Sequence, residues 1–201
     1  MPGEKEYGWK AEPMRDERGF MTLEQVERVI DAAETDRDRM LLTLLARSGR
    51  RISEIIGEHG ITPAHVDSDE GFIYFMILKK KERKRYPIPV DVETVRMLQE
   101  YIDDNFIQDD EKIFPISRQR AFQIVRSCGK RAGIEHVGSK RIHPHHFRHS
   151  FAVLLAKSIR NPAELRKVQD ILKHSNIQIT TSYLKFNQSD TKKLLDRVFN
   201  K

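Results

Sequence analysis

Residues 143–152 place a histidine and an arginine where both can bind one anion. On a helix that begins at Pro144, His145 and Arg148 are three residues apart and therefore share a face. The planar guanidinium of an arginine can bind two phosphate oxygens at once, and an imidazole beside it can donate a hydrogen bond or accept a proton. This spacing predicts a phosphate-binding surface.

The same histidine-rich run permits two further interpretations. His145 and His149 are four residues apart, as the ligands of a zinc ion on a helix can be. A catalytic zinc helix would also need the glutamate of an HExxH arrangement, or further cysteine and histidine ligands in register, and neither is present. A plain polar helix start is the remaining interpretation. We expect no metal and no cofactor.

Two further segments contain groups that suit the same chemistry. In the run 49–54, Arg51 precedes Glu54 by one helical turn, a spacing that by itself is typical of a surface ion pair. In the run 172–183, His174 precedes a small polar turn and Tyr183 follows on a short helix. A solitary tyrosine is more typical of a core or hydrogen-bonding position. Neither segment identifies a site without the other.

Together, the R-x-S-E-like run, the H-x-x-R-H run and the histidine followed by a tyrosine resemble the catalytic motifs of the tyrosine recombinase (phage integrase) family, in its Xer-like form. Order and spacing agree over about residues 21–201. The resemblance implies that Arg51 and Arg148 clamp the phosphate and that His145 and His174 line the same pocket. It also implies that Tyr183 is the nucleophile and that Glu54 is a buried carboxylate that orients the first arginine.

The family also places a lysine on the hairpin between the second and third strands. The basic run 79–85 occupies this position, and counting from its two sides favours either Lys81 or Lys80; we assign Lys81. Lys173 stands where a glycine is usual, His146 stands where an acidic residue is common, and the hairpin lacks its usual glycines. These departures affect the subfamily and the hairpin alignment more than the chemistry.

The resemblance implies a site-specific recombinase or integrase that breaks and rejoins DNA strands through a 3′-phosphotyrosyl intermediate, without nucleotide or metal. A type IB topoisomerase shares closely similar tyrosine chemistry and relaxes supercoils as a monomer. Two rival functions are a DNA-binding module that kept only the fold and a histidine-rich metal hydrolase. The expected partners are double-stranded DNA and further copies of the chain, of which a complete synapse contains four. Residues 184–201 are the expected docking element between copies. Free of DNA, the chain is expected to be a monomer.

Composition agrees with a DNA partner and excludes a membrane protein. The chain has 36 Lys and Arg residues against 30 Asp and Glu residues, a formal charge of +6, and a surplus of this sign favours polyanions. No apolar run approaches the roughly 20 residues that a membrane span requires. The charged amino terminus does not look like an export signal, and Cys128 has no cysteine to pair with. We therefore expect a cytoplasmic protein.

The elements that must position these groups predict an α+β fold that is mainly helical, with a small three-stranded antiparallel sheet. Residues 1–20 are expected to be an arm or linker remnant, and residues 21–201 a catalytic domain without an amino-terminal core-binding domain. Thr22 and Gln25 predict a capping box at the start of a helix to about residue 33. A second, apolar helix ends at Ser48-Gly49. The predicted strands are 61–66, 71–78 and 85–90. Two further helices are predicted to begin after the caps Asp91 and Ser117, and four more at 144–159, 162–173, 180–185 and 190–199.

Overall fold

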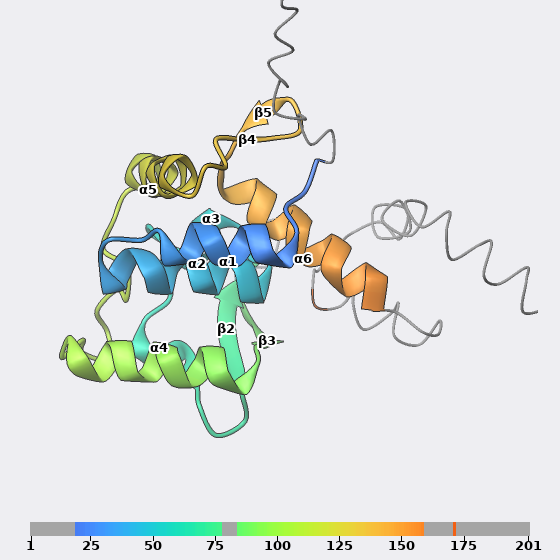
Figure 1. Cartoon of the computed structure of the whole chain (residues 1–201). Coiled ribbons are helices and arrows are strands. Elements are labelled where there is room, and N and C mark those ends of the chain that lie inside the picture. Colours follow the sequence, from blue (N-terminus) through green and yellow to red (C-terminus); the bar gives the residue numbers. More distant parts are fainter. Residues whose placement is uncertain (1–18, 78–83, 159–170, 172–201) are drawn as a thin grey trace, which may run out of the picture.

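Six α-helices and two small sheets form the part of the chain that the computed structural model describes, residues 19–77, 84–158 and 171 (Figure 1). The helices are α1 (Leu23–Asp31), α2 (Asp36–Ser48), α3 (Ile52–Ile55), α4 (Val92–Asp104), α5 (Arg118–Arg131) and α6 (Pro144–Ser158). None of these helices is long and apolar enough to span a membrane. The helices predicted after residue 159 and the residues Lys80, Lys81, His174 and Tyr183 lie outside the described residues.

The two amino-terminal helices form where the sequence predicts them. Thr22 and Gln25 make the predicted capping box, because the Thr22 hydroxyl accepts from the Gln25 N–H at 3.2 Å and the Gln25 amide oxygen accepts from the Thr22 N–H at 2.9 Å. Helix α1 ends at Asp31, two residues before the predicted end. The leucines of α2 are fully buried, namely Leu41, Leu42, Leu44 and Leu45. Helix α2 packs against α1, α4 and α6 and therefore forms the centre of the core.

The predicted three-stranded antiparallel sheet is present in the order β1 (Val66–Asp67), β2 (Phe72–Met76) and β3 (Arg85–Pro89). The predicted first strand, 61–66, is wrong except at its last residue. Pro63 to His65 form a 3₁₀ turn instead, because a proline lacks a ladder donor and suits the first turn of a helix. The Thr62 N–H donates to the His65 ring at 3.0 Å and closes this turn.

A second, two-stranded sheet, which was not predicted from the sequence, lies between α5 and α6. Strands β4 (His136–Val137) and β5 (Lys140–Arg141) pair around a tight turn in which Gly138 has a φ of 58°. Asp91 and Ser117 cap α4 and α5 as predicted. Phe20, which the prediction placed in the arm, is buried beside the ring of His149 on α6.

The turn between α2 and α3 approaches α6 closely at Gly49. This glycine ends α2 with a left-handed φ of 61°, and a Cβ at its position would lie 2.3 Å from Cδ1 of the Phe151 ring. A side chain is therefore excluded for two reasons, backbone conformation and contact with α6. The close approach brings the residues that follow Gly49 next to the face of α6.

We expect Gly49→Ala to lower the free energy of unfolding by more than Gly57→Ala. Both glycines have a left-handed φ, 61° and 75°, but a Cβ at Gly57 would meet nothing within 4 Å. The Gly57 variant should lose about 1–2 kcal/mol from backbone strain, and the Gly49 variant should lose about 1–3 kcal/mol more from overpacking against Phe151. Urea denaturation measures both losses. Equal losses would contradict the close contact with α6.

Candidate active site

A buried carboxylate organises the first arginine of the site. Glu54 is fully buried on α3, and its Oε1 lies 2.9 Å from Nη1 of Arg51. Its Oε2 accepts from the backbone N–H of Arg51 at 3.0 Å. Both oxygens of Glu54 therefore bind one residue, the side chain of which stays 18% exposed. The predicted pair of Arg51 and Glu54 is present, with Glu54 in the interior rather than at the surface.

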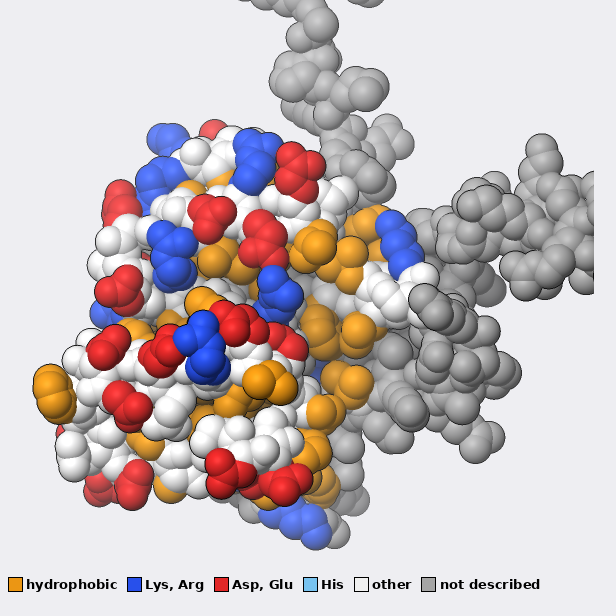
Figure 2. Space-filling model, turned by 60° about the horizontal axis from the view of Figure 1, so that its bottom comes forward, with side chains coloured by type: hydrophobic (Ala, Val, Ile, Leu, Met, Phe, Trp, Pro, Cys, Tyr) orange, Lys and Arg blue, Asp and Glu red, His pale blue; other side chains and the backbone are white. Residues whose placement is uncertain are grey.

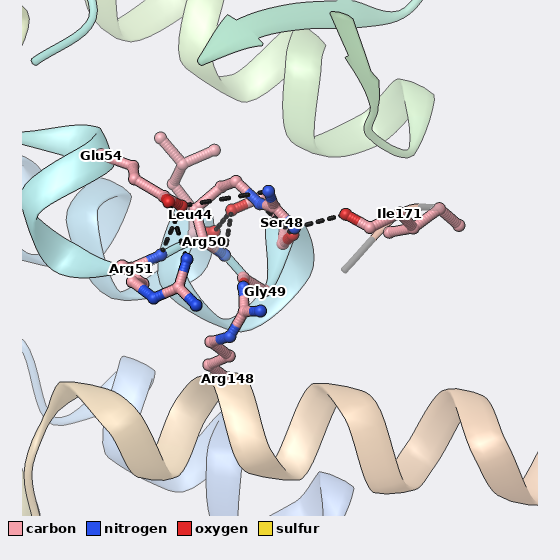
Figure 3. A network of polar contacts seen from close by, with 8 residues as sticks. All are labelled: Leu44, Ser48, Gly49, Arg50, Arg51, Glu54, Arg148 and Ile171. Carbon is pink, nitrogen blue, oxygen red and sulfur yellow. Dashed lines mark hydrogen bonds and ion pairs between the residues drawn. The ribbon is translucent and has the colours of Figure 1, made fainter. Parts of the chain in front are cut away.

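The second arginine reaches the same turn from α6. Arg148 is buried, and its Nη1 donates to the carbonyl oxygen of Gly49 at 2.6 Å. In Figure 3 the guanidinium groups of Arg51 and Arg148 point toward one another beside this turn. Both also act electrostatically on Arg50 and on His145, which agrees with a shared location. Two residues far apart in the sequence thus offer guanidinium groups at one place.

His145 is exposed on α6 beside these arginines. Its pKa lies below the usual value of 6.5, mainly because the surrounding protein removes part of the water around the ring, and also because His143, Arg51 and Arg148 disfavour a positive charge on it. The imidazole is therefore neutral at pH 7. A neutral histidine next to two arginines can accept a proton from a group that attacks an anion bound there.

The other histidines of the run fix the start of α6. The His143 N–H donates to Nδ1 of His146 at 3.1 Å, and the two rings stack with centroids 4.0 Å apart. Burial, with His143 as the next cause, lowers the pKa of His146 to about 4. Among the described residues no group of three or more His, Cys, Asp or Glu side chains could hold a metal ion.

A hydrogen-bonded chain ties the amino-terminal segment to the same helix. Ser150 is fully buried, its hydroxyl accepts from the Met21 N–H at 2.8 Å, and it donates to the carbonyl oxygen of His146 at 2.7 Å. One side of α6 is thereby held against residue 21. The opposite orientation of this helix would turn Arg148 and His145 away from Arg51.

Arg50 borders the site, although no role was predicted for it from the sequence. Its side chain is fully buried beside Glu54, with Nη1 3.9 Å from Oε2 of that carboxylate. The available signal was the spacing, because residues four apart around a short helix share a face. Lys81, His174 and Tyr183 lie outside the described residues, so their predicted places in the site stay predictions.

Comparison with known proteins finds a matching family model and a similar curated protein. The family model described as "Phage integrase family" matches residues 19–190. The tyrosine recombinase XerD of Neisseria meningitidis serogroup B is 31% identical over an alignment of 180 positions, which covers 82% of this chain and 57% of that protein. This chain therefore spans somewhat more than half the length of that relative.

Two solved structures share the fold. The crystal structure of XerA recombinase superposes with a TM-score of 0.68 at 24% identity, over 90% of this chain and 65% of that one. The XerH site-specific recombinase bound to difH substrate in a pre-cleavage complex superposes with a TM-score of 0.67 at 19% identity, over 87% of this chain and 52% of that one. Both confirm a mainly helical domain with a small antiparallel sheet.

We expect Glu54→Gln to destabilise the protein by about 3 kcal/mol, because it leaves the guanidinium groups of Arg51 and of the buried Arg50 without their counter-charge. Glu27→Gln is the matched control: Glu27 pairs with Arg47 at 2.6 Å, but both side chains are partly exposed, and surface pairs contribute little. Thermal and urea denaturation measure both variants. If the two substitutions had equal effects, Glu54 would not organise the turn.

Proposed function

The chain belongs to the phage integrase family, and we propose that it is a tyrosine recombinase catalytic domain that breaks and rejoins DNA strands through a 3′-phosphotyrosyl intermediate at Tyr183. The family match over residues 19–190 and the XerD relative support recombination over relaxation of the type IB topoisomerase kind. The observation that carries the proposal is the convergence of Arg51 and Arg148 on one turn, with His145 beside them.

The paired guanidinium groups suit the phosphodiester. As the nucleophile approaches, negative charge gathers on the two non-bridging oxygens of the phosphate. Arg51 and Arg148 are held in place before the substrate arrives, the first by Glu54 and the second by the Gly49 carbonyl oxygen. Donors that are fixed in advance cost no reorganisation during the reaction, and such help often supplies the largest catalytic contribution.

Tyr183 needs a base, because the pKa of a free phenol is near 10. His145 is neutral at pH 7 and takes this proton as the phenol oxygen bonds to phosphorus and the bond from phosphorus to the 5′ oxygen breaks. Lys81 gives a proton to the departing 5′ oxygen, and His174 donates a hydrogen bond to the phosphate. Religation reverses the same steps, so no nucleotide, cofactor or metal is consumed.

Charge is divided between two neighbouring parts of the sequence. Residues 91–111 contain eight acidic residues and one arginine, whereas residues 112–158 contain ten Lys or Arg residues and one acidic residue, Glu135. Figure 2 views a face on which acidic side chains are spread. The basic stretch includes α5, whose exposed Arg118 and Arg126 line a shallow groove with Phe122. DNA is expected on this basic side.

The α5 groove adjoins the site. The ring of Phe122 lies 6.3 Å from that of His143, which in turn lies 6.0 Å from that of His145, and Arg118 lies over the Phe122 ring. A duplex bound along α5 therefore reaches the arginine pair. Complete recombination involves four copies of the chain on two duplexes, and the chain is a monomer when it is free of DNA. The reaction takes place in the cytoplasm. The single cysteine supports this location, because it cannot form an internal disulfide.

We expect Tyr183→Phe to bind duplex DNA with unchanged affinity and to form no covalent adduct. The substitution removes only the attacking oxygen and keeps the aromatic ring. Nicked suicide duplexes followed by denaturing electrophoresis report the adduct as a band of lower mobility, and chelator should leave that band unchanged in the wild-type chain. An adduct formed by the Phe variant would overturn the assignment of the nucleophile.

Arg118→Ala and Arg126→Ala should each weaken DNA binding by about the same factor for any sequence, because each removes one phosphate contact. The slope of log K against log salt concentration should fall in magnitude by about 0.9 for each substitution. Arg96→Ala on the acidic helix α4 is the control and should leave the slope unchanged. Fluorescence anisotropy across a salt series makes the measurement. A slope that changes only for Arg96 would place DNA on the α4 side.

A further inference from the structure

Arg50 is a fully buried arginine whose hydrogen bonds are incompletely satisfied. Its Nε donates to the Ser48 carbonyl oxygen at 3.3 Å, and its Nη2 donates to the carbonyl oxygen of Ile171 (Figure 3). Its Nη1 has no hydrogen-bond partner among the described residues and lies 3.9 Å from Glu54 Oε2. Both oxygens of Glu54 already bind Arg51, so that Arg50 gains only a weak attraction from this carboxylate.

This arrangement is costly to the folded state. Burial lowers the pKa of Arg50 from its ordinary value to about 9; Glu54 opposes the shift, and the positive charges of Arg148 and Arg51 add to it. An unpaired donor in the interior also loses its hydration without compensation. An apolar side chain of similar volume fills such a position at equal or lower cost. The benefit that Arg50 brings is therefore something other than stability.

The bond to Ile171 connects two distant parts of the chain. It joins the turn that carries Arg51 to a residue 121 positions later in the sequence. Ile171 also lines a mainly apolar groove together with Phe151 and Leu154 of α6. Ile171 precedes His174 by three residues and Tyr183 by twelve.

Arg50 cannot touch the substrate itself. None of its side chain is exposed, whereas Arg51 keeps part of its guanidinium accessible. Any effect of Arg50 on the reaction must therefore act through what it binds. Of its partners, Ser48 belongs to the same turn, and only Ile171 belongs to the segment that leads to His174 and Tyr183.

We propose that Arg50 is a positioning residue, which fixes the backbone at Ile171 against the turn of Arg51 and so sets where His174 and Tyr183 stand relative to the arginine pair. This inference rests on the proposed function and deepens it. It assigns the buried arginine to the alignment of nucleophile and phosphate, where errors of about 1 Å can cost up to roughly a hundredfold in rate.

Arg50→Met tests the proposal, because methionine fills a similar volume and makes none of the hydrogen bonds. We expect an unchanged or higher Tm, DNA affinity within about twofold of wild type, and adduct formation on nicked suicide duplexes that is at least about tenfold slower. Arg50→Lys keeps one donor and should restore part of the rate. Arg39→Met, at a surface pair with Asp31, is the matched control and should change neither rate nor Tm.

The outcomes separate the inference from the proposed function. A wild-type rate in Arg50→Met, or a slower rate accompanied by a matching loss of Tm, overturns the positioning role and leaves the recombinase assignment intact. If the wild-type chain forms no adduct, the proposed function fails, and hydrogen exchange then decides the role of Arg50. Faster amide exchange in the peptide that contains Ile171 in the Met variant supports the tether, and unchanged exchange overturns it.

Discussion

The carboxylate of Glu54 is the negative charge around which the site is built, because Arg50 and Arg51 both lie beside it and Arg148 reaches the same turn. A buried carboxylate is tolerated only when it is paired and hydrogen bonded. Here Arg51 satisfies it through both backbone and side chain, which fixes the direction of that guanidinium. Three arginines and one carboxylate leave positive charge in excess. Under the proposed function, a bound phosphate would supply the negative charge that this cluster lacks.

The second arginine depends on backbone geometry rather than on an ion pair with Glu54. Arg148 is directed by the carbonyl oxygen of Gly49, and this carbonyl is accessible from α6 because Gly49 carries no side chain. The contact of Gly49 with Phe151 then fixes how closely α6 approaches the turn. A single left-handed glycine thus determines the distance between the elements that carry the two arginines. Helix α6 is held from its other side by the hydrogen bond that the Met21 N–H donates to the Ser150 hydroxyl.

Local signals in the sequence predicted what local physics decides. The capping box of Thr22, the cap of Asp91 and the break at Gly49 were all found, because each depends on residues a few positions apart. The strand predicted at 61–66 failed because Pro63 favours a turn over a ladder position. Arg51, Arg148 and Glu54 were assigned through the resemblance of separated motifs, and the structure places all three at one turn. The spacing of Arg50 and Glu54 could have indicated that the two lie together, but the bond of Arg50 to Ile171, 121 residues away, follows from no local pattern.

The electrostatics of the site couple substrate binding to the strength of the base. With no anion between them, Arg51 and Arg148 repel a proton on His145 and help to keep its pKa below 6.5. A phosphate bound to both arginines cancels part of this repulsion, so the pKa of His145 rises toward its usual value. The imidazole then becomes a stronger base only when the phosphodiester is in place. Under the proposed function, the arginine pair therefore does two things for the reaction: it binds the phosphate, and through that binding it prepares His145 to accept the proton of Tyr183.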